Sequence, residues 1–210
     1  ERALKIVGSR PARPDGVDKV TGRALFGADK SLPNMLVGRV LRSPYAHAKI
    51  ISIDTSKAEE LKGVKAIVTS TDFEDFPSEF VPNGEMVVNM KDITRNVMAR
   101  EKALYVGHTV AAVAATSEDI AEQALALIDV TYEVLPHVLE VEDAEKPGAP
   151  LLHDDMITIG IEPAPESASN VAKRVEFGFG DVEKGFSEAD LIIEREFTTQ
   201  QVHQGYIEPH

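Results

Sequence analysis

The sequence predicts an α/β fold, and three features of residues 104–136 support that prediction most directly. Residues 106–115 form a short apolar run of strand character that Gly107 opens. A polar Thr116-Ser117 pair follows, and after it apolar residues recur at helical spacing. Residues 130–134 then alternate apolar and polar side chains, as a half-buried strand does. The predicted unit is therefore strand, capped helix, strand.

The predicted helix has both a start signal and a stripe that faces a core. The hydroxyls of Thr116-Ser117 offer an N-terminal cap, and Glu118 and Asp119 bring negative charge into the first turn. Apolar residues stand at i, i+4 and i+8, with apolar neighbours beside them, so one face of the helix should be buried. The stripe comprises Ile120, Ala121, Ala124, Leu125 and Ile128.

The first half of the chain contains a similar strand–helix–strand pattern. Two strands are expected at residues 35–41 and 49–53, and a third at residues 64–69. Thr55-Ser56 should cap a short helix that runs to Leu61, and Gly63 is a plausible C-terminal stop. This order of elements and its Thr-Ser cap match the later unit, which we interpret as weak internal pseudo-symmetry.

The other segments are predicted to be loops, an arm and a short helix. Pro and Gly among arginines make residues 1–18 an extended arm, and an acidic run with Pro and Gly marks a boundary at residues 140–149. Residues 72–95 should form a long loop with a hairpin at Asn83-Gly84, and residues 161–170 a second loop. A short helix is expected at residues 182–189, followed by an alternating segment, 191–199, whose inward-facing set is Leu191, Ile193 and Phe197.

Composition excludes several classes of function. The chain has 210 residues and 43% apolar content, enough to bury a core in one or two domains. Its formal charge of −13 argues against a nucleic-acid surface, which needs a basic face. Because it has no cysteine, it can hold neither a disulfide nor an iron–sulfur cluster of its own. Neither a membrane-spanning run nor a secretory leader is apparent, so we expect a cytoplasmic protein.

The motifs of common metal and nucleotide sites are missing from the sequence. The six histidines form no H-x-H, H-x-x-x-H or H-E-x-x-H pair, so we expect no metal site built by this chain. His47 and His108, each beside a predicted strand, are assigned structural roles, with an interface role also open for His108. Gly178-Phe179-Gly180 lacks the third glycine of a dinucleotide motif, because position 183 is Glu, and is interpreted as a turn.

The best chemical candidate in the chain is the segment 204–209. Gly205 permits close approach of the backbone, and Tyr206 offers a flat apolar face with a polar tip. Glu208 precedes a proline, which holds its carboxylate on an extended backbone. The competing interpretation is that Glu208 only anchors the segment through hydrogen bonds.

Several stretches resemble, in the same order, motifs of one enzyme family, the molybdenum hydroxylases of the xanthine dehydrogenase and aldehyde oxidase type. The similarity is to the N-terminal part of that family's large molybdopterin-binding subunit. It extends along nearly the whole chain, and the shared order makes it specific. The matching stretches are the D-x-x-x-K-V-T-G entry at 15–22, L-R-S-P-x-A-H-A-x-I at 41–50, G-V-x-A-x-x-T at 63–69, V-G-x-x-V-A-x-V-x-A at 106–115, V-x-Y-x-x-L-P at 130–136, G-A-P-x-x-H at 148–153, and Gly180 onward with Gln204 to Pro209.

This resemblance implies a domain order. After the arm at residues 1–18, residues 19–140 would form the family's hammerhead-type α/β domain. Residues 141–210 would begin the first molybdopterin-binding domain, an α+β domain that is incomplete here.

The resemblance also implies an activity: oxidation of a C–H bond of an aldehyde, an N-heterocycle or a related substrate, with oxygen from water. It implies a molybdopterin cofactor held mainly by residues outside this chain, with iron–sulfur clusters and FAD on partner domains or subunits. The expected partners are the continuation of the molybdopterin-binding subunit, an iron–sulfur subunit and a flavin subunit.

No catalytic residue is expected in this chain, because the family's general-base glutamate lies downstream of the last matching motif. The weak cofactor-binding candidates, near the expected active-site wall, are Gln204, Gly205, Tyr206 and Glu208. A different class of function is also open, in which the polypeptide is a non-catalytic scaffold that binds partner subunits.

Overall fold

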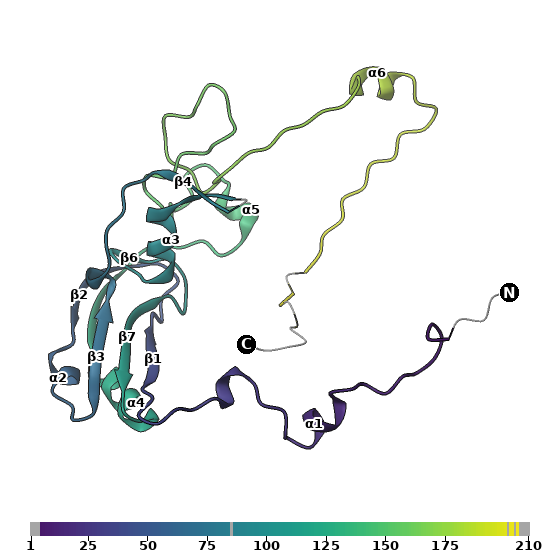
Figure 1. Cartoon of the computed structure of the whole chain (residues 1–210). Coiled ribbons are helices and arrows are strands. Elements are labelled where there is room, and N and C mark those ends of the chain that lie inside the picture. Colours follow the sequence, from purple (N-terminus) through teal and green to yellow (C-terminus); the bar gives the residue numbers. More distant parts are fainter. Residues whose placement is uncertain (1–4, 85, 201, 204, 206–210) are drawn as a thin grey trace. The chain divides into compact units, whose positions relative to one another are not determined.

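The computed structural model describes residues 5–84, 86–200, 202–203 and 205. The chain divides into two units (Figure 1). The main unit is Leu36–Val182, and the terminal unit is formed by Glu1–Met35 with Glu183–His210. Helices and strands together confirm the predicted mixed α/β class, although every pairing between named strands is antiparallel in the described residues.

The first sheet of the main unit has the strand order β1-β7-β3. Its strands are β1 (Val37–Arg42), β3 (Val64–Thr69) and β7 (Thr109–Ala115). The central strand β7 begins three residues later than predicted, because Gly107 lies at φ +89° in a turn. In that turn the backbone N–H of Gly107 donates to the carbonyl of Ser43 at 2.8 Å. Gly107 therefore closes a turn before the strand instead of opening the strand.

The second sheet has the order β6-β2-β8. It consists of β2 (Ala48–Asp54), β6 (Lys102–Ala103) and β8 (Asp129–Val134). The expected alternation of β8 holds at Val130 and Tyr132, which are half-buried, but Val134 is exposed.

Helix α4 (Glu118–Leu127) forms as the sequence predicts. Ser117 caps it, since its hydroxyl accepts a hydrogen bond from the backbone N–H of Ile120 at 3.3 Å. The predicted stripe is inward: Ala121 and Ala124 are fully buried and Ile128 nearly so. Because Ala121 and Ala124 have small side chains, the helix can pack closely on β7, where Ala111, Val113 and Ala115 are buried in the same cluster.

Helix α2 (Ser56–Glu59) is shorter than predicted and has a different cap. The carboxylate of Asp54 accepts from both the backbone N–H and the hydroxyl of Ser56, at 3.0 and 2.6 Å. These hydrogen bonds, led by the one from the hydroxyl, lower the pKa of Asp54. The hydroxyl of Thr55 instead donates to the Glu59 side chain at 2.6 Å. The helix start was therefore located correctly, but Asp54 supplies the cap.

The two strand–helix–strand sets interlock through their strand pairing, which the sequence did not predict. β2 pairs with β8 and β3 pairs with β7, so the first strand of each set pairs with the last strand of the other. Helices α2 and α4 lie near each other, at the same end of these strands (Figure 1). Gly63 joins the sets directly, because its carbonyl accepts from the N–H of Thr116 at 2.9 Å.

Residues 72–95 are only partly the loop that the sequence predicts. The hairpin exists: β4 (Phe80–Asn83) pairs with β5 (Met86–Asn89) beside Gly84. Helix α3 (Met90–Val97) follows it and was not predicted. Asn89 caps α3 through its side-chain carbonyl, which accepts from the N–H of Lys91 at 3.1 Å. Its apolar residues Met90, Ile93 and Val97 stand at helical spacing, although none of its described residues is buried.

After β8 the main unit continues mostly without regular structure. Helix α5 (Val141–Ala144) falls inside the predicted boundary segment. Residues 161–170 form a loop, as expected, and an isolated bridge joins Ile159 to Lys173.

The terminal unit has little regular structure in its described residues. It contains α1 (Gly16–Val20) and the 3₁₀ turn η1 (Gly27–Asp29), and α6 (Val182–Ser187) begins at the join with the main unit. The α6 prediction is confirmed with a slightly earlier end. Residues 191–199, all described, form no strand, and Leu191, Ile193 and Phe197 are exposed instead of inward-facing. The expected inward-facing set has nothing to face here, because no strand pairs with this segment among the described residues. Across the described residues, no helix has both the length and the apolarity that a membrane crossing needs.

Candidate functional site

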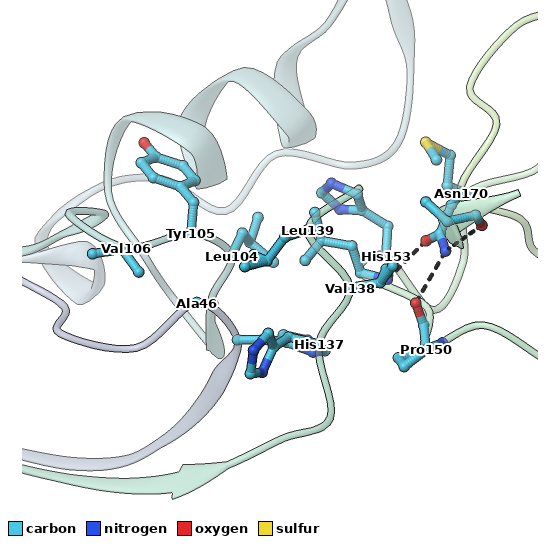
Figure 2. A pocket seen from close by; sticks show the side chains of 14 residues that line it. Ala46, Leu104, Tyr105, Val106, His137, Val138, Leu139, Pro150, His153 and Asn170 are labelled. Carbon is cyan, nitrogen blue, oxygen red and sulfur yellow. Dashed lines mark hydrogen bonds between the residues drawn. The ribbon is translucent and has the colours of Figure 1, made fainter. Parts of the chain in front are cut away.

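A cavity of about 410 Å³ lies within the main unit (Figure 2). One wall comes from the start of β2 and from the turn before β7, and the other from the irregular chain after β8. Most of its lining is aliphatic, and none of the described residues that line it is Asp, Glu, Lys or Arg. The lining residues are Ala46, His47, Leu104, Tyr105, Val106, His137, Val138, Leu139, Ala144, Pro150, Leu152, His153, Met156 and Asn170.

Asn170 fixes the wall that follows β8. Its amide nitrogen donates to the carbonyls of Ala144 and Pro150, at 3.1 and 3.0 Å, and its amide oxygen accepts from the N–H of Leu152 at 3.0 Å (Figure 2). One side chain thus ties together three backbone positions of a segment that lacks sheet or helix bonds. The sequence offered no signal for this role, because Asn170 lies at the end of a predicted loop.

His47 connects the start of β2 to the chain that leaves β8. It is 5% exposed, and its Nδ1 lies 2.8 Å from the carbonyl oxygen of Pro136. Its own carbonyl accepts from the N–H of Leu135 at 3.0 Å. The predicted structural role is therefore confirmed. Its Nε2 is buried and has no hydrogen-bond partner among the described residues.

His108 holds the turn that forms the opposite wall. It is fully buried, and its Nδ1 accepts from the N–H of Leu104 at 3.1 Å. Its ring stacks on Tyr105 with the ring centroids 4.4 Å apart. Burial lowers the pKa of His108, so the neutral ring that this hydrogen bond needs is favoured. The structural role predicted for His108 is confirmed, and the turn that it holds, residues 104–106, lines the cavity.

A second pocket, of about 310 Å³, adjoins the first and is lined by charged side chains. It shares Leu104, Leu152 and His153 with the cavity. Lys102 pairs with Asp154 at 2.8 Å, and Lys91 pairs with Asp155, whose pKa the Lys91 hydrogen bond lowers. These two ion pairs fasten the segment after β8 to β6 and α3. Arg95 and Arg100 also line this pocket, and each lies near a carboxylate, at 3.1 and 3.7 Å respectively.

Comparison with known proteins identifies the family. The model of the aldehyde oxidase and xanthine dehydrogenase a/b hammerhead domain matches residues 21–136, more than half of the chain. The chain belongs to the aldehyde oxidase and xanthine dehydrogenase family. A second model, of a molybdopterin cofactor-binding domain, matches residues 164–210. The resemblance drawn from the sequence motifs is thus confirmed.

The relatives are the large molybdenum-enzyme chains that the motifs indicate. A probable xanthine dehydrogenase subunit of Bacillus subtilis is 39% identical over 93% of this chain and 23% of its own length. The carbon monoxide dehydrogenase large chain of Afipia carboxidovorans is 32% identical over 99% of this chain and 26% of its own. Among solved structures, reconstituted CO dehydrogenase from Oligotropha carboxidovorans matches 88% of this chain with a TM-score of 0.66 and 31% identity. The chain therefore spans about a quarter of the length of these relatives.

The cavity is lined by residues 46–47 and 104–106, which match the hammerhead model, and by residues after 136 that lead into the segment matched to the cofactor-binding model. The four residues proposed for the active-site wall are Gln204, Gly205, Tyr206 and Glu208. Gly205 is exposed and outside any helix or strand, whereas Gln204, Tyr206 and Glu208 lie outside the described residues. Their assignment stays a prediction. The described residues contain no group of three or more His, Cys, Asp or Glu side chains placed to hold a metal ion.

Proposed function

We propose that this chain is the hammerhead portion, and the beginning of the molybdopterin-binding portion, of a molybdenum hydroxylase. The observation that carries the proposal is that one chain matches a hammerhead model at residues 21–136 and a molybdopterin cofactor-binding model at residues 164–210. The assembled enzyme would oxidise a C–H bond of an aldehyde, an N-heterocycle or a related substrate with oxygen from water. We place the arm at residues 1–18, the hammerhead domain at 19–140 and the cofactor domain from 141.

The described residues do not by themselves fit a molybdopterin. Its phosphate and its polar pterin edge need several free hydrogen-bond donors and acceptors, but the cavity lining is mostly aliphatic and the amide of Asn170 is already bonded to three backbone groups. We therefore assign the cofactor to residues outside the described part of this chain, with Gln204, Gly205, Tyr206 and Glu208 as candidates for a nearby wall. The iron–sulfur clusters and FAD would belong to partner domains or subunits.

The described residues would then hold the chain in place instead of binding the cofactor. Asn170 and the Lys102–Asp154 and Lys91–Asp155 pairs hold residues 144–170 against the hammerhead sheets, which directs the chain into the cofactor-binding segment. Exposed Leu191, Ile193 and Phe197 suit burial by the rest of that domain or by a partner subunit. We also propose a cytoplasmic location for the assembled enzyme.

The test is co-expression of the chain with the products of the genes that adjoin its own, followed by purification through a tag on this chain. Support would be a complex that contains molybdenum, iron and flavin and reduces a dye in the presence of an aldehyde or a purine. The isolated chain should contain no stoichiometric molybdenum by elemental analysis. A stable complex that lacks molybdenum and activity would favour the non-catalytic scaffold instead.

A further inference from the structure

One face of the β4-β5 hairpin is apolar and exposed. Side chains two residues apart on a strand, and those directly opposite each other across the ladder, lie on the same face. Phe80 and Pro82 of β4 therefore share a face with Val87 of β5, which pairs with Pro82. Phe80 is 60% exposed and Val87 66%, and Pro82 is exposed as well. We call these three residues the hairpin face.

The opposite face of the hairpin is the one that is partly covered. It carries Val81 and Val88, which pair across the ladder and are both half-buried. A two-stranded hairpin is at best marginally stable in water unless a further layer packs on it. Exposed apolar patches with a polar rim also mark sites of protein association. The hairpin face is therefore a candidate docking surface.

The charge around the hairpin face has a single sign. Residues 72–89 contain five Asp or Glu and no Lys, Arg or His. Asp75 lies 3.8 Å from the side chain of Arg95, which offsets its charge. Glu74 and Glu79 are exposed and form no ion pair with the described residues. The rim of the hairpin face therefore attracts a basic surface and repels an acidic one.

This sign decides between possible occupants. A second copy bound through the same face would bring two acidic rims together. An anionic membrane or a nucleic acid would be repelled for the same reason. We propose that the hairpin face docks a partner subunit of the assembled enzyme through a surface with an apolar centre and a rim of Lys or Arg. This inference rests on the proposed function for the existence of that subunit.

Met86 and Val87 are a matched pair of test positions. They are neighbours in β5 and each is 66% exposed, but their side chains point to opposite faces. The probe is the product of an adjoining gene that co-purifies with the parent chain, expressed separately and titrated onto the immobilised full chain. Val87→Asn should weaken its binding at least about tenfold, whereas Met86→Asn should change it by about twofold or less.

The rim charge has a test of its own. Glu79→Lys reverses a charge beside the hairpin face. Glu60→Lys makes the same change at an exposed position at the end of α2, far from the hairpin (Figure 1). Glu79→Lys should weaken binding and reduce its dependence on salt concentration, because it removes an attraction that salt screens. Glu60→Lys should leave both quantities unchanged.

Thermal melting checks that each variant is folded, and Phe80→Asn repeats the apolar test from β4 if Val87→Asn is not. Equal binding by the Val87 and Met86 variants, or undiminished binding by Glu79→Lys, would overturn the docking surface but leave the proposed function intact, because a complex still forms. A dimer of the parent chain that Val87→Asn dissociates would also overturn it. If no product of an adjoining gene binds the parent chain, both proposals fail.

Discussion

Gly63 joins the two halves of the hammerhead domain at a position where an added Cβ would force neighbouring side chains to move. It lies at φ +106°, and a Cβ placed there would lie 2.6 Å from Cδ1 of Ile120 and 2.9 Å from Oγ1 of Thr116. Left-handed backbone costs a residue with a Cβ about 1–2 kcal/mol, and overpacking costs about 1–3 kcal/mol more. Gly63→Ala should therefore reduce the free energy of unfolding by about 2–5 kcal/mol.

Two other glycines separate the two causes. Gly107 has φ +89° with nothing within 4 Å of the added Cβ, so Gly107→Ala should show the backbone cost alone, about 1–2 kcal/mol. Gly38 in β1 has neither problem, and Gly38→Ala should be nearly neutral. The order of destabilisation in urea titrations should be Gly63, then Gly107, then Gly38.

Ile120→Val supplies the decisive cross-check, because it removes the Cδ1 atom that the new methyl group would strike. By itself it should cost about 0.5–1.5 kcal/mol. Combined with Gly63→Ala it should cost clearly less than the sum of the two single changes, which a double-mutant cycle measures. If Gly63→Ala is no worse than Gly107→Ala, or if the two effects simply add, Gly63 does not pack closely on α4 and the reasoning is refuted.

Three further predictions concern the core, the ion pairs and the terminal unit. Ala124→Asp puts an unpaired carboxylate at a fully buried position and should lower the free energy of unfolding by about 3–5 kcal/mol. Gln123→Asp, at an exposed position of the same helix, should lower it by about 0.5 kcal/mol or less. Equal midpoints of the two variants in denaturant titrations would contradict the burial of α4. Lys91 lowers the pKa of Asp155, so this pair stabilises the fold above the unfolded carboxyl pKa of about 3.9, and that contribution is lost as the pH falls through the lower folded value. As the pH falls below about 4, the unfolding free energy should therefore fall more steeply in the parent chain than in the Lys91→Met variant. The difference should be small, because Asp155 is largely exposed. Identical pH slopes for the two chains would refute the pairing. In hydrogen exchange on the isolated chain, residues 191–199 should be weakly protected and β7 strongly protected, and strong protection of both would show that the terminal segment is already packed.

The sequence predicted those parts of the fold in which local pattern and tertiary burial agree. β3, β7, α4 and β8 were located to within three residues, because each has an apolar run or an apolar periodicity of the right length. Helix α3 was missed although Met90, Ile93 and Val97 stand at helical spacing, because it is short and lies within the segment that was predicted to be a loop. Its start depends on a local hydrogen bond to the side chain of Asn89.

The cavity was beyond sequence reasoning for a different reason. Its key polar residues, His47, His137, His153 and Asn170, come from well-separated parts of the chain, and none stands in a spacing that marks a site. Three of these residues lie at or next to the motifs that carry the family resemblance, yet motif matching could not show that they share one space. Only the pairing of β2 with β8 brings His47 next to Pro136.

The exchanged pairing of the two strand–helix–strand sets explains why the segment after β8 is held where it is. Because β8 pairs with β2, the chain that leaves β8 must pass His47 at the start of β2 and reach β6 on the far side of the same strand. There Lys102 of β6 forms an ion pair with Asp154. Further along the same segment, the amide of Asn170 donates a hydrogen bond to the carbonyl of Ala144 at the end of α5. The hammerhead domain thereby fixes the direction in which the chain enters the residues matched to the cofactor-binding domain. A domain in which we expect no catalytic residue can therefore still hold residues 144–170 in place.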